Sequence, residues 1–264
     1  MPVAWKAWAF FKRDLLTDLS YKFSFALQVI DILAGIGAYY FLARVLGKAA
    51  FRGYDPFPFI LVGVAVNGYM STCLACFAQA IRGNQPLGTL KMVLVTPTSP
   101  VAFILYSSLY PFVRAAVDAV LYLLAGTMFG LSLGRVNFPA MLLIFLLSAV
   151  AFSSIGILSA TFTLVFKRGD PIVWFFGSLS WLLGGVFYPV EVLPRFLQHA
   201  SQFLPITHAL VGMRAALLGG VSIAQILPQI GMLALFGVVG LPVSLLGFYW
   251  GVRQARTRGT LSHF

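Results

Sequence analysis

Residues 139–166 read PAMLLIFLLSAVAFSSIGILSATFTLVF, a stretch that contains no charged side chain. An α-helix rises about 1.5 Å per residue, so about 20 apolar residues cross a hydrocarbon core of about 30 Å. The stretch exceeds that length, and Lys167 and Arg168 follow it directly. We therefore predict a transmembrane helix here, and the basic residues at its end favour a cytoplasmic position for that end.

The same apolar pattern recurs along the chain. We expect six spans, at 23–46, 57–81, 101–131, 139–166, 172–188 and 229–250. The fifth is the shortest, but the apolar run from Ile172 to Val190 can cross the core with little tilt. Hydrophobic residues make up 60% of the 264 residues and charged residues 9%, whereas soluble domains carry about 25% charged residues. The composition predicts an all-α polytopic membrane protein, with 1–264 as one transmembrane domain and no room for a large soluble catalytic domain.

The N-terminal segment 1–22 has the pattern of an interfacial amphipathic helix. Its charged residues interrupt any apolar core of a signal peptide. One side of the expected helix carries Trp5, Trp8, Phe11, Leu15, Leu16 and Leu19. Phe10 and Lys12 fall on the opposite faces from those the pattern requires, so the amphipathicity is moderate. We expect this helix to lie in the membrane interface, in contact with lipid.

The segment 189–228 is apolar but is broken by prolines, which end helices. Pro205 separates two short amphipathic patterns, and Gly219 and Gly220 end the second. The first pattern comprises Leu193, Phe196, Leu197 and Ala200, and the second comprises Ile206, Leu210, Met213 and Leu217. We expect an extracellular helical hairpin that dips into the outer leaflet and packs on the spans or on a partner subunit.

The charge balance favours an orientation and excludes one partner. The net charge is +11, but no basic run is long enough to follow a nucleic-acid backbone, so we expect no nucleic-acid partner. With the N-terminus inside, the cytoplasmic segments carry more of the 18 Lys and Arg residues than the outer segments do. This bias predicts that both termini are cytoplasmic.

Charges within the spans are candidate functional residues. Arg114 and Asp118 are four residues apart on one helical face, where they can pair. An unpaired charge near the bilayer centre costs about 2.5–3.5 kcal/mol, so we expect an inward-facing pair. It has either a structural role or a role in substrate contact or gating. Asp31, near Gln28, can face the subunit interface or the transport pathway.

No catalytic, cofactor-binding or metal-binding arrangement is visible. Cys73 and Cys76 lie within an expected span and are interpreted as packing residues, and the three histidines lack neighbouring ligands at metal-site spacing. The chain also lacks the G-x-x-x-x-G-K-[ST] loop that binds the phosphates of ATP. Any ATP hydrolysis must therefore occur on another chain.

The expected cytoplasmic loop between the second and third spans contains a further short helix, at 84–97. Asn84 or Gln85 ahead of Pro86 suits a helix start, and Pro97 ends the helix. Leu87, Leu90 and Leu94 recur on one face. This helix either docks a soluble partner or only anchors the loop at the membrane surface.

Two stretches resemble the type-2 ATP-binding-cassette (ABC) export permeases of drugs, lipids and lipid-linked glycans. Residues 88–100, GTLKMVLVTPTSP, resemble the family's coupling-helix segment. Residues 184–220, GGVFYPVEVLPRFLQHASQFLPITHALVGMRAALLGG, resemble the signature that follows its fifth span. The six-span plan and the N-terminal helix also agree, so the resemblance extends over nearly the whole chain.

The resemblance implies a homodimeric permease in a bacterial inner membrane, in contact with lipid and with an amphipathic substrate. A separate nucleotide-binding ATPase subunit, which holds ATP and Mg²⁺, would dock on the coupling helix. The implied docking residues are Leu87, Gly88, Thr89, Leu90, Lys91, Leu94, Thr96 and Pro97, and the implied outer gate comprises Tyr188, Pro189, Glu191, Pro194 and Arg214. Lys91 differs from the family pattern, which often has Glu at this position. The reversed charge implies a matching change in the surface of the ATPase subunit.

Two other classes remain open. An ion-coupled secondary transporter could titrate Asp31 and the pair formed by Arg114 and Asp118. Such carriers often contain inverted repeats, and residues 23–131 show no convincing similarity to residues 139–250. A membrane-embedded enzyme would need a nucleophile and a base, which the sequence does not supply in a recognisable arrangement.

Overall fold

The computed structural model describes residues 3–47, 51, 54–84, 99–134, 136–166 and 170–257. Throughout these ranges the regular elements are helices. Five of the described helices are long and apolar enough to cross a membrane. The expected fold class, an all-α polytopic membrane protein, is confirmed.

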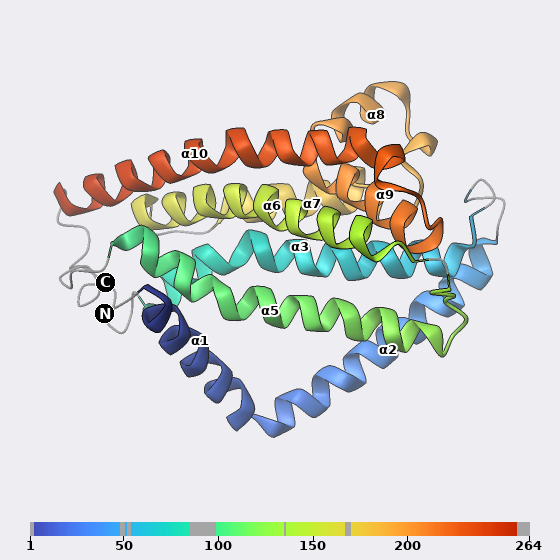
Figure 1. Ribbon diagram of the computed structural model, residues 1–264, viewed down its shortest axis with the longest axis horizontal. Helices are drawn as coiled ribbons and strands as arrows, with labels where there is room; N and C mark the ends of the chain where they lie inside the picture. The colour runs from blue at the N-terminus through green and yellow to red at the C-terminus, as the bar shows by residue number, and fades with distance from the viewer. Residues whose placement is uncertain are drawn as a thin grey trace.

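The long helices form an elongated bundle (Figure 1). They are α2 (Lys22–Leu46), α3 (Pro56–Asn84), α5 (Pro100–Thr127), α6 (Phe138–Phe166) and α10 (Leu227–Thr257). Helix α3 has the largest buried share of these five, and it packs against both α5 and α6. Helix α10 lies along α6. The start of α1 (Val3–Ser20) and the end of α10 lie at the same end of the bundle (Figure 1).

Small residues allow the central helices to approach closely. Gly156 of α6 faces α3, where a Cβ would lie 2.8 Å from the carbonyl oxygen of Cys73. Cys73 and Cys76 are both buried free cysteines in α3. This environment agrees with a packing role for the two cysteines, because the thiols behave as small apolar groups at a tight helix contact.

Helix α1 forms an elbow with α2, and it packs on α5 through aromatic side chains (Figure 1). The ring of Phe10 meets that of Phe103 with centroids 5.9 Å apart. Trp5 and Trp8, by contrast, are 68% and 58% exposed. Phe10 therefore does not disrupt the pattern, because α1 has two apolar faces, one against α5 and one that is exposed. That the second face lies in the membrane interface stays a prediction.

The fifth expected span differs from the others. Helix α7 (Pro171–Leu183) has 13 residues, a length of about 20 Å, and is shorter than the candidate spans. It starts at Asp170, whose carboxylate accepts the backbone N–H of Val173. After Gly184 the chain turns at Gly185, which has a φ of 77°. The helix expected over 172–188 thus ends at Leu183, because the paired glycines allow a turn although the apolar run continues.

Two short helices follow in the segment 189–228, with a 3₁₀ turn at Val190–Val192 before them and another at Ile223–Ile226 after them. Helix α8 (Arg195–Gln202) carries Phe196, which is 72% exposed in this chain, so its contact with the outer leaflet or a partner subunit stays a prediction. Helix α9 (Pro205–Leu218) is mostly buried and packs on α3, α6 and α10. Its four expected core residues are all buried: Ile206, Leu210, Met213 and Leu217.

Candidate functional site

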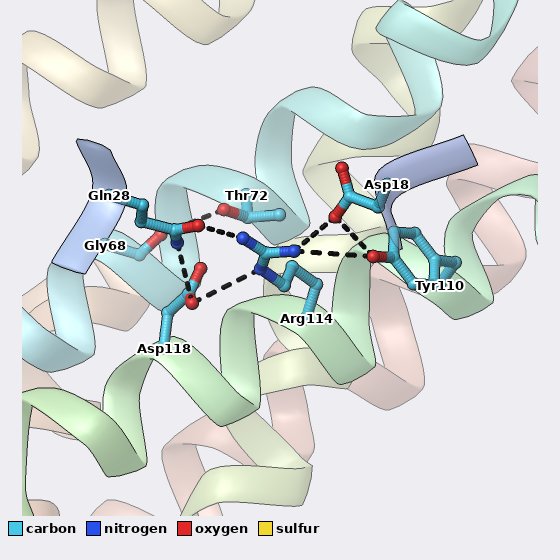
Figure 2. Close-up of polar contacts among 7 residues, drawn as sticks. All are labelled: Asp18, Gln28, Gly68, Thr72, Tyr110, Arg114 and Asp118. Carbon is cyan, nitrogen blue, oxygen red and sulfur yellow. Dashed lines mark hydrogen bonds and ion pairs between the residues drawn. The ribbon is translucent and has the colours of Figure 1, made fainter. Parts of the chain in front are cut away.

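A network of partly exposed polar side chains joins α1, α2 and α5 (Figure 2). Its centre is Arg114, midway along α5. The guanidinium donates through Nη1 to Asp18 of α1 and through Nη2 to Gln28 of α2. Its Nε lies 3.4 Å from Oδ1 of Asp118, so the pair expected four residues apart is present.

The network extends beyond that pair. Gln28 also donates to Asp118 over 2.8 Å, and the hydroxyl of Tyr110 donates to Asp18. The guanidinium is thereby shared between two carboxylates and an amide oxygen, which lowers the cost of placing a charge inside the bundle. Sequence reasoning missed Asp18 and Tyr110 as partners, because Asp18 lies in the expected interfacial helix, far along the chain from Arg114.

Asp31 lies one turn beyond Gln28 on α2 and is separate from this network. No hydrogen bond or ion pair joins it to another of the residues that the structure describes. It lines a cavity of about 260 Å³ between α2, α3 and α5, which Asp118 also lines. The two intramembrane carboxylates singled out from the sequence therefore meet at one cavity.

A second polar centre lies between α9 and the start of α3. Arg214 is 8% exposed, and its guanidinium lies over the ring of Phe59, 3.4 Å from the centroid. It donates to three backbone oxygens, those of Phe59 at 3.0 Å, Gly185 at 2.8 Å and Val186 at 2.8 Å. Burial lowers the pKa of Arg214 to about 9, and Glu191 opposes that shift, so the guanidinium is still charged at neutral pH.

The residues of the expected outer gate are only partly brought together. Pro189, Glu191 and Arg214 line one cavity of about 310 Å³. Tyr188 instead donates its hydroxyl to the backbone oxygen of Leu182. Pro194 is exposed at the start of α8 and is not among the lining residues.

A third polar centre lies where α3 leads into the expected coupling segment. The side chain of Asp170 is 8% exposed, and its carboxylate accepts from Arg82 of α3 at 3.0 Å and from Ser159 of α6 at 2.5 Å. One carboxylate thus joins the ends of α3 and α7 to the side of α6. Sequence reasoning did not single out this group, although a helix-capping Asp ahead of Pro171 was a visible signal.

The expected coupling helix itself lies outside the described residues, except for Asn84, the last residue of α3. Its docking residues therefore stay predictions: Leu87, Gly88, Thr89, Leu90, Lys91, Leu94, Thr96 and Pro97. Ser99 follows this segment, and its hydroxyl caps α5 by accepting the N–H of Ala102. The two ends that flank the segment, at Arg82 and Ser99, are thus fixed by polar contacts.

Together, the long apolar helices, the buried Pro-initiated α9 and the polar centres between helices are the features of a polytopic membrane protein. Residues 6–218 match the family described as ABC-2 type transporter. Because the match extends over most of the chain, the chain belongs to the ABC-2 type transporter family.

Curated relatives agree with this family. The chain is 26% identical over 214 residues to the inner membrane transport permease YadH of Escherichia coli (strain K12), which covers 80% of this chain and 79% of the relative. The same figures hold for the inner membrane transport permease YadH of Shigella flexneri. The chain is thus a transport permease, as the sequence resemblance implied.

Proposed function

We propose that this chain is the membrane subunit of an ATP-driven exporter in a bacterial inner membrane. Two copies enclose the pathway, and a separate nucleotide-binding ATPase subunit, carrying ATP and Mg²⁺, docks on 84–97. The substrate is an amphipathic drug, lipid or lipid-linked glycan taken from the cytoplasm or the inner leaflet. The match of residues 6–218 to the ABC-2 family carries this proposal, and relatives named as inner membrane permeases support the location.

The link at Asp170 supports a mechanical role for the coupling segment. Arg82 is two residues from the end of α3, directly before that segment, and its partner Asp170 starts α7. Helix α7 leads into α8 and α9, at the other end of the bundle (Figure 1). The ion pair between Arg82 and Asp170 can therefore transmit a movement of the coupling segment to α7 and to the cavity at Arg214.

The proposed docking of the ATPase implies an orientation in the membrane. The first turn of α1 and the last turn of α10 lie at the end of the bundle where the coupling segment leaves α3 (Figure 1). An ATPase that docks on this segment is cytoplasmic, so both termini are cytoplasmic and the hairpin of α8 and α9 is outside.

Affinity purification of the tagged chain from its native membrane tests the proposal. A stoichiometric ATPase subunit with a phosphate-binding loop should co-purify, together with ATP hydrolysis. Changing Leu87, Leu90 and Leu94 to Asp should abolish co-purification. The matched control changes three exposed apolar residues of α1, Trp5, Leu16 and Leu19, to Asp, and should retain the ATPase.

Purification of the chain alone, without ATP hydrolysis, would overturn the proposal and favour the ion-coupled carrier. The observation that favours this second candidate is Asp31, an exposed carboxylate of α2 that lines a cavity between α2, α3 and α5. A carrier would transport in response to a proton gradient in vesicles without ATP, and Asp31→Asn would abolish that transport.

A further inference from the structure

The cavity between α2, α3 and α5 has an unusual lining for a membrane interior. Its volume is about 260 Å³, and its polar groups include two carboxylates, those of Asp31 and Asp118. No Lys or Arg appears among its lining residues in the described part of the chain. The remaining lining is largely apolar or aromatic, so the cavity combines negative charge with a hydrophobic wall.

The carboxylates lie deep within their helices. Asp31 is nine residues from the start of α2, where it is exposed at the rim of the cavity, and Asp118 is nine residues from the end of α5. At about 1.5 Å per residue, each is about 13 Å from the nearer end of its helix. Charged groups at such depths are costly and are retained where they have a partner or a function.

The charges around the cavity are not balanced within the described residues. Arg114 already forms ion pairs with Asp18 and Asp118, so one positive charge is shared by two carboxylates. Asp31 has no hydrogen bond or ion pair to another described residue. A cation that binds beside Asp31 would supply this missing positive charge, whereas an anionic group would meet repulsion.

The surroundings also point to the shape of the ligand. Leu27, four residues before Asp31 on the same face of α2, is 50% exposed and extends the apolar surface outward. Tyr122 also lines the cavity, and an aromatic ring attracts a cation that lies over its face. The volume is below the range of about 300–1,000 Å³ for drug-sized ligands, so the cavity suits a headgroup with its tail outside.

We propose that this cavity binds the ammonium headgroup of an amphiphile, with Asp31 as the counter-ion and the tail lying along α2. The inference rests on the proposed export function and names its substrate class. An aminophospholipid of the inner leaflet and a free hydrophobic amine share this chemistry.

Equilibrium binding of radiolabelled octylammonium to the full-length chain in phosphatidylcholine nanodiscs tests the proposal. Wild-type protein should bind the probe saturably, and octanoate, which has the same number of carbons but a negative charge, should not compete. Asp31→Asn should raise the Kd about tenfold, which corresponds to about 1.4 kcal/mol. Asp14→Asn is the matched control, because Asp14 pairs with Arg13 on α1, and it should leave the Kd unchanged.

A second variant fills the cavity without changing any charge. Gly68 of α3 lines the cavity, and a Cβ there would meet no atom within 4 Å. Gly68→Leu should therefore fold and should abolish saturable binding. Gly37→Leu, at a position on α2 where a Cβ is equally unobstructed, is its control. The proposal is overturned if Asp31→Asn and Gly68→Leu both bind as wild type does, or if octanoate competes.

Phosphatidylethanolamine added to the nanodiscs distinguishes the two sources. Displacement of octylammonium from wild-type protein assigns the site to the lipid headgroup, and retention assigns it to a free hydrophobic amine. The measurement needs no ATPase. If wild-type protein does not bind octylammonium, only the cavity proposal is refuted. If no ATPase subunit co-purifies, only the proposed exporter function is refuted.

Discussion

Replacement of Arg214 by leucine should destabilise the protein strongly. The guanidinium donates four hydrogen bonds to three backbone oxygens, those of Phe59, Gly185 and Val186, and all of these bonds are lost in Arg214→Leu. Each buried acceptor left without a donor costs about 1–3 kcal/mol. Removal of a buried charge also relieves its desolvation, so the lower value is appropriate. Three carbonyls at about 1 kcal/mol each give a loss of about 3 kcal/mol.

The loss can be measured as a thermal midpoint by fluorescence-detected size-exclusion chromatography in detergent. For a chain of this size, about 1 kcal/mol corresponds to about 2–4 °C, so the midpoint should fall by about 6–12 °C. Arg195→Leu is the matched control, because Arg195 is exposed at the start of α8 and carries the same charge. A midpoint for Arg214→Leu equal to that of the control would refute the assignment of Arg214 as the residue that holds α9 to α3.

Two further predictions concern packing and ion pairing. Gly63→Val should lower the thermal midpoint far more than Gly37→Val does. A Cβ at position 63 clashes with the backbone oxygen of Val186, whereas a Cβ at position 37 meets no atom within 4 Å. Equal midpoints for the two variants would contradict the close contact of Gly63 with Val186. A double-mutant cycle with Arg82→Gln and Asp170→Asn should give a coupling free energy of about 0.5–1 kcal/mol, since asparagine retains the helix cap and Arg82 is partly exposed. Additive effects of the two substitutions would show that this ion pair contributes nothing to the free energy of unfolding.

The sequence predicted the long helices well because hydrophobic length alone determines them. The apolar run at 139–166 agrees with α6 (Phe138–Phe166), and the span expected at 23–46 agrees with α2 (Lys22–Leu46). The end of the fifth span was not predicted, since the residues after Leu183 stay apolar and hydropathy does not distinguish a helix from a turn. The Gly184 and Gly185 pair was the only local signal for that end.

The polar centres were predictable only where both partners lie on one helix. The spacing of Arg114 and Asp118 placed them on one face, and they do interact. The contact of Arg114 with Asp18 depends on how α1 folds back onto α5, which no local pattern specifies. Arg214 was assigned to an outer gate by resemblance, but its bonds to backbone oxygens required the tertiary arrangement.

The short helix α7 has a consequence for the surrounding lipid. Its exposed side chains, among them Trp174 and Leu182, form an apolar surface about 20 Å tall, against a hydrocarbon core of about 30 Å. Lipid beside this surface has to thin, at a cost of a fraction of a kcal/mol per Å of mismatch, unless another protein surface covers it. A membrane thinned there presents a shorter hydrocarbon barrier, so a polar headgroup that crosses beside α7 travels a reduced distance between the two aqueous phases.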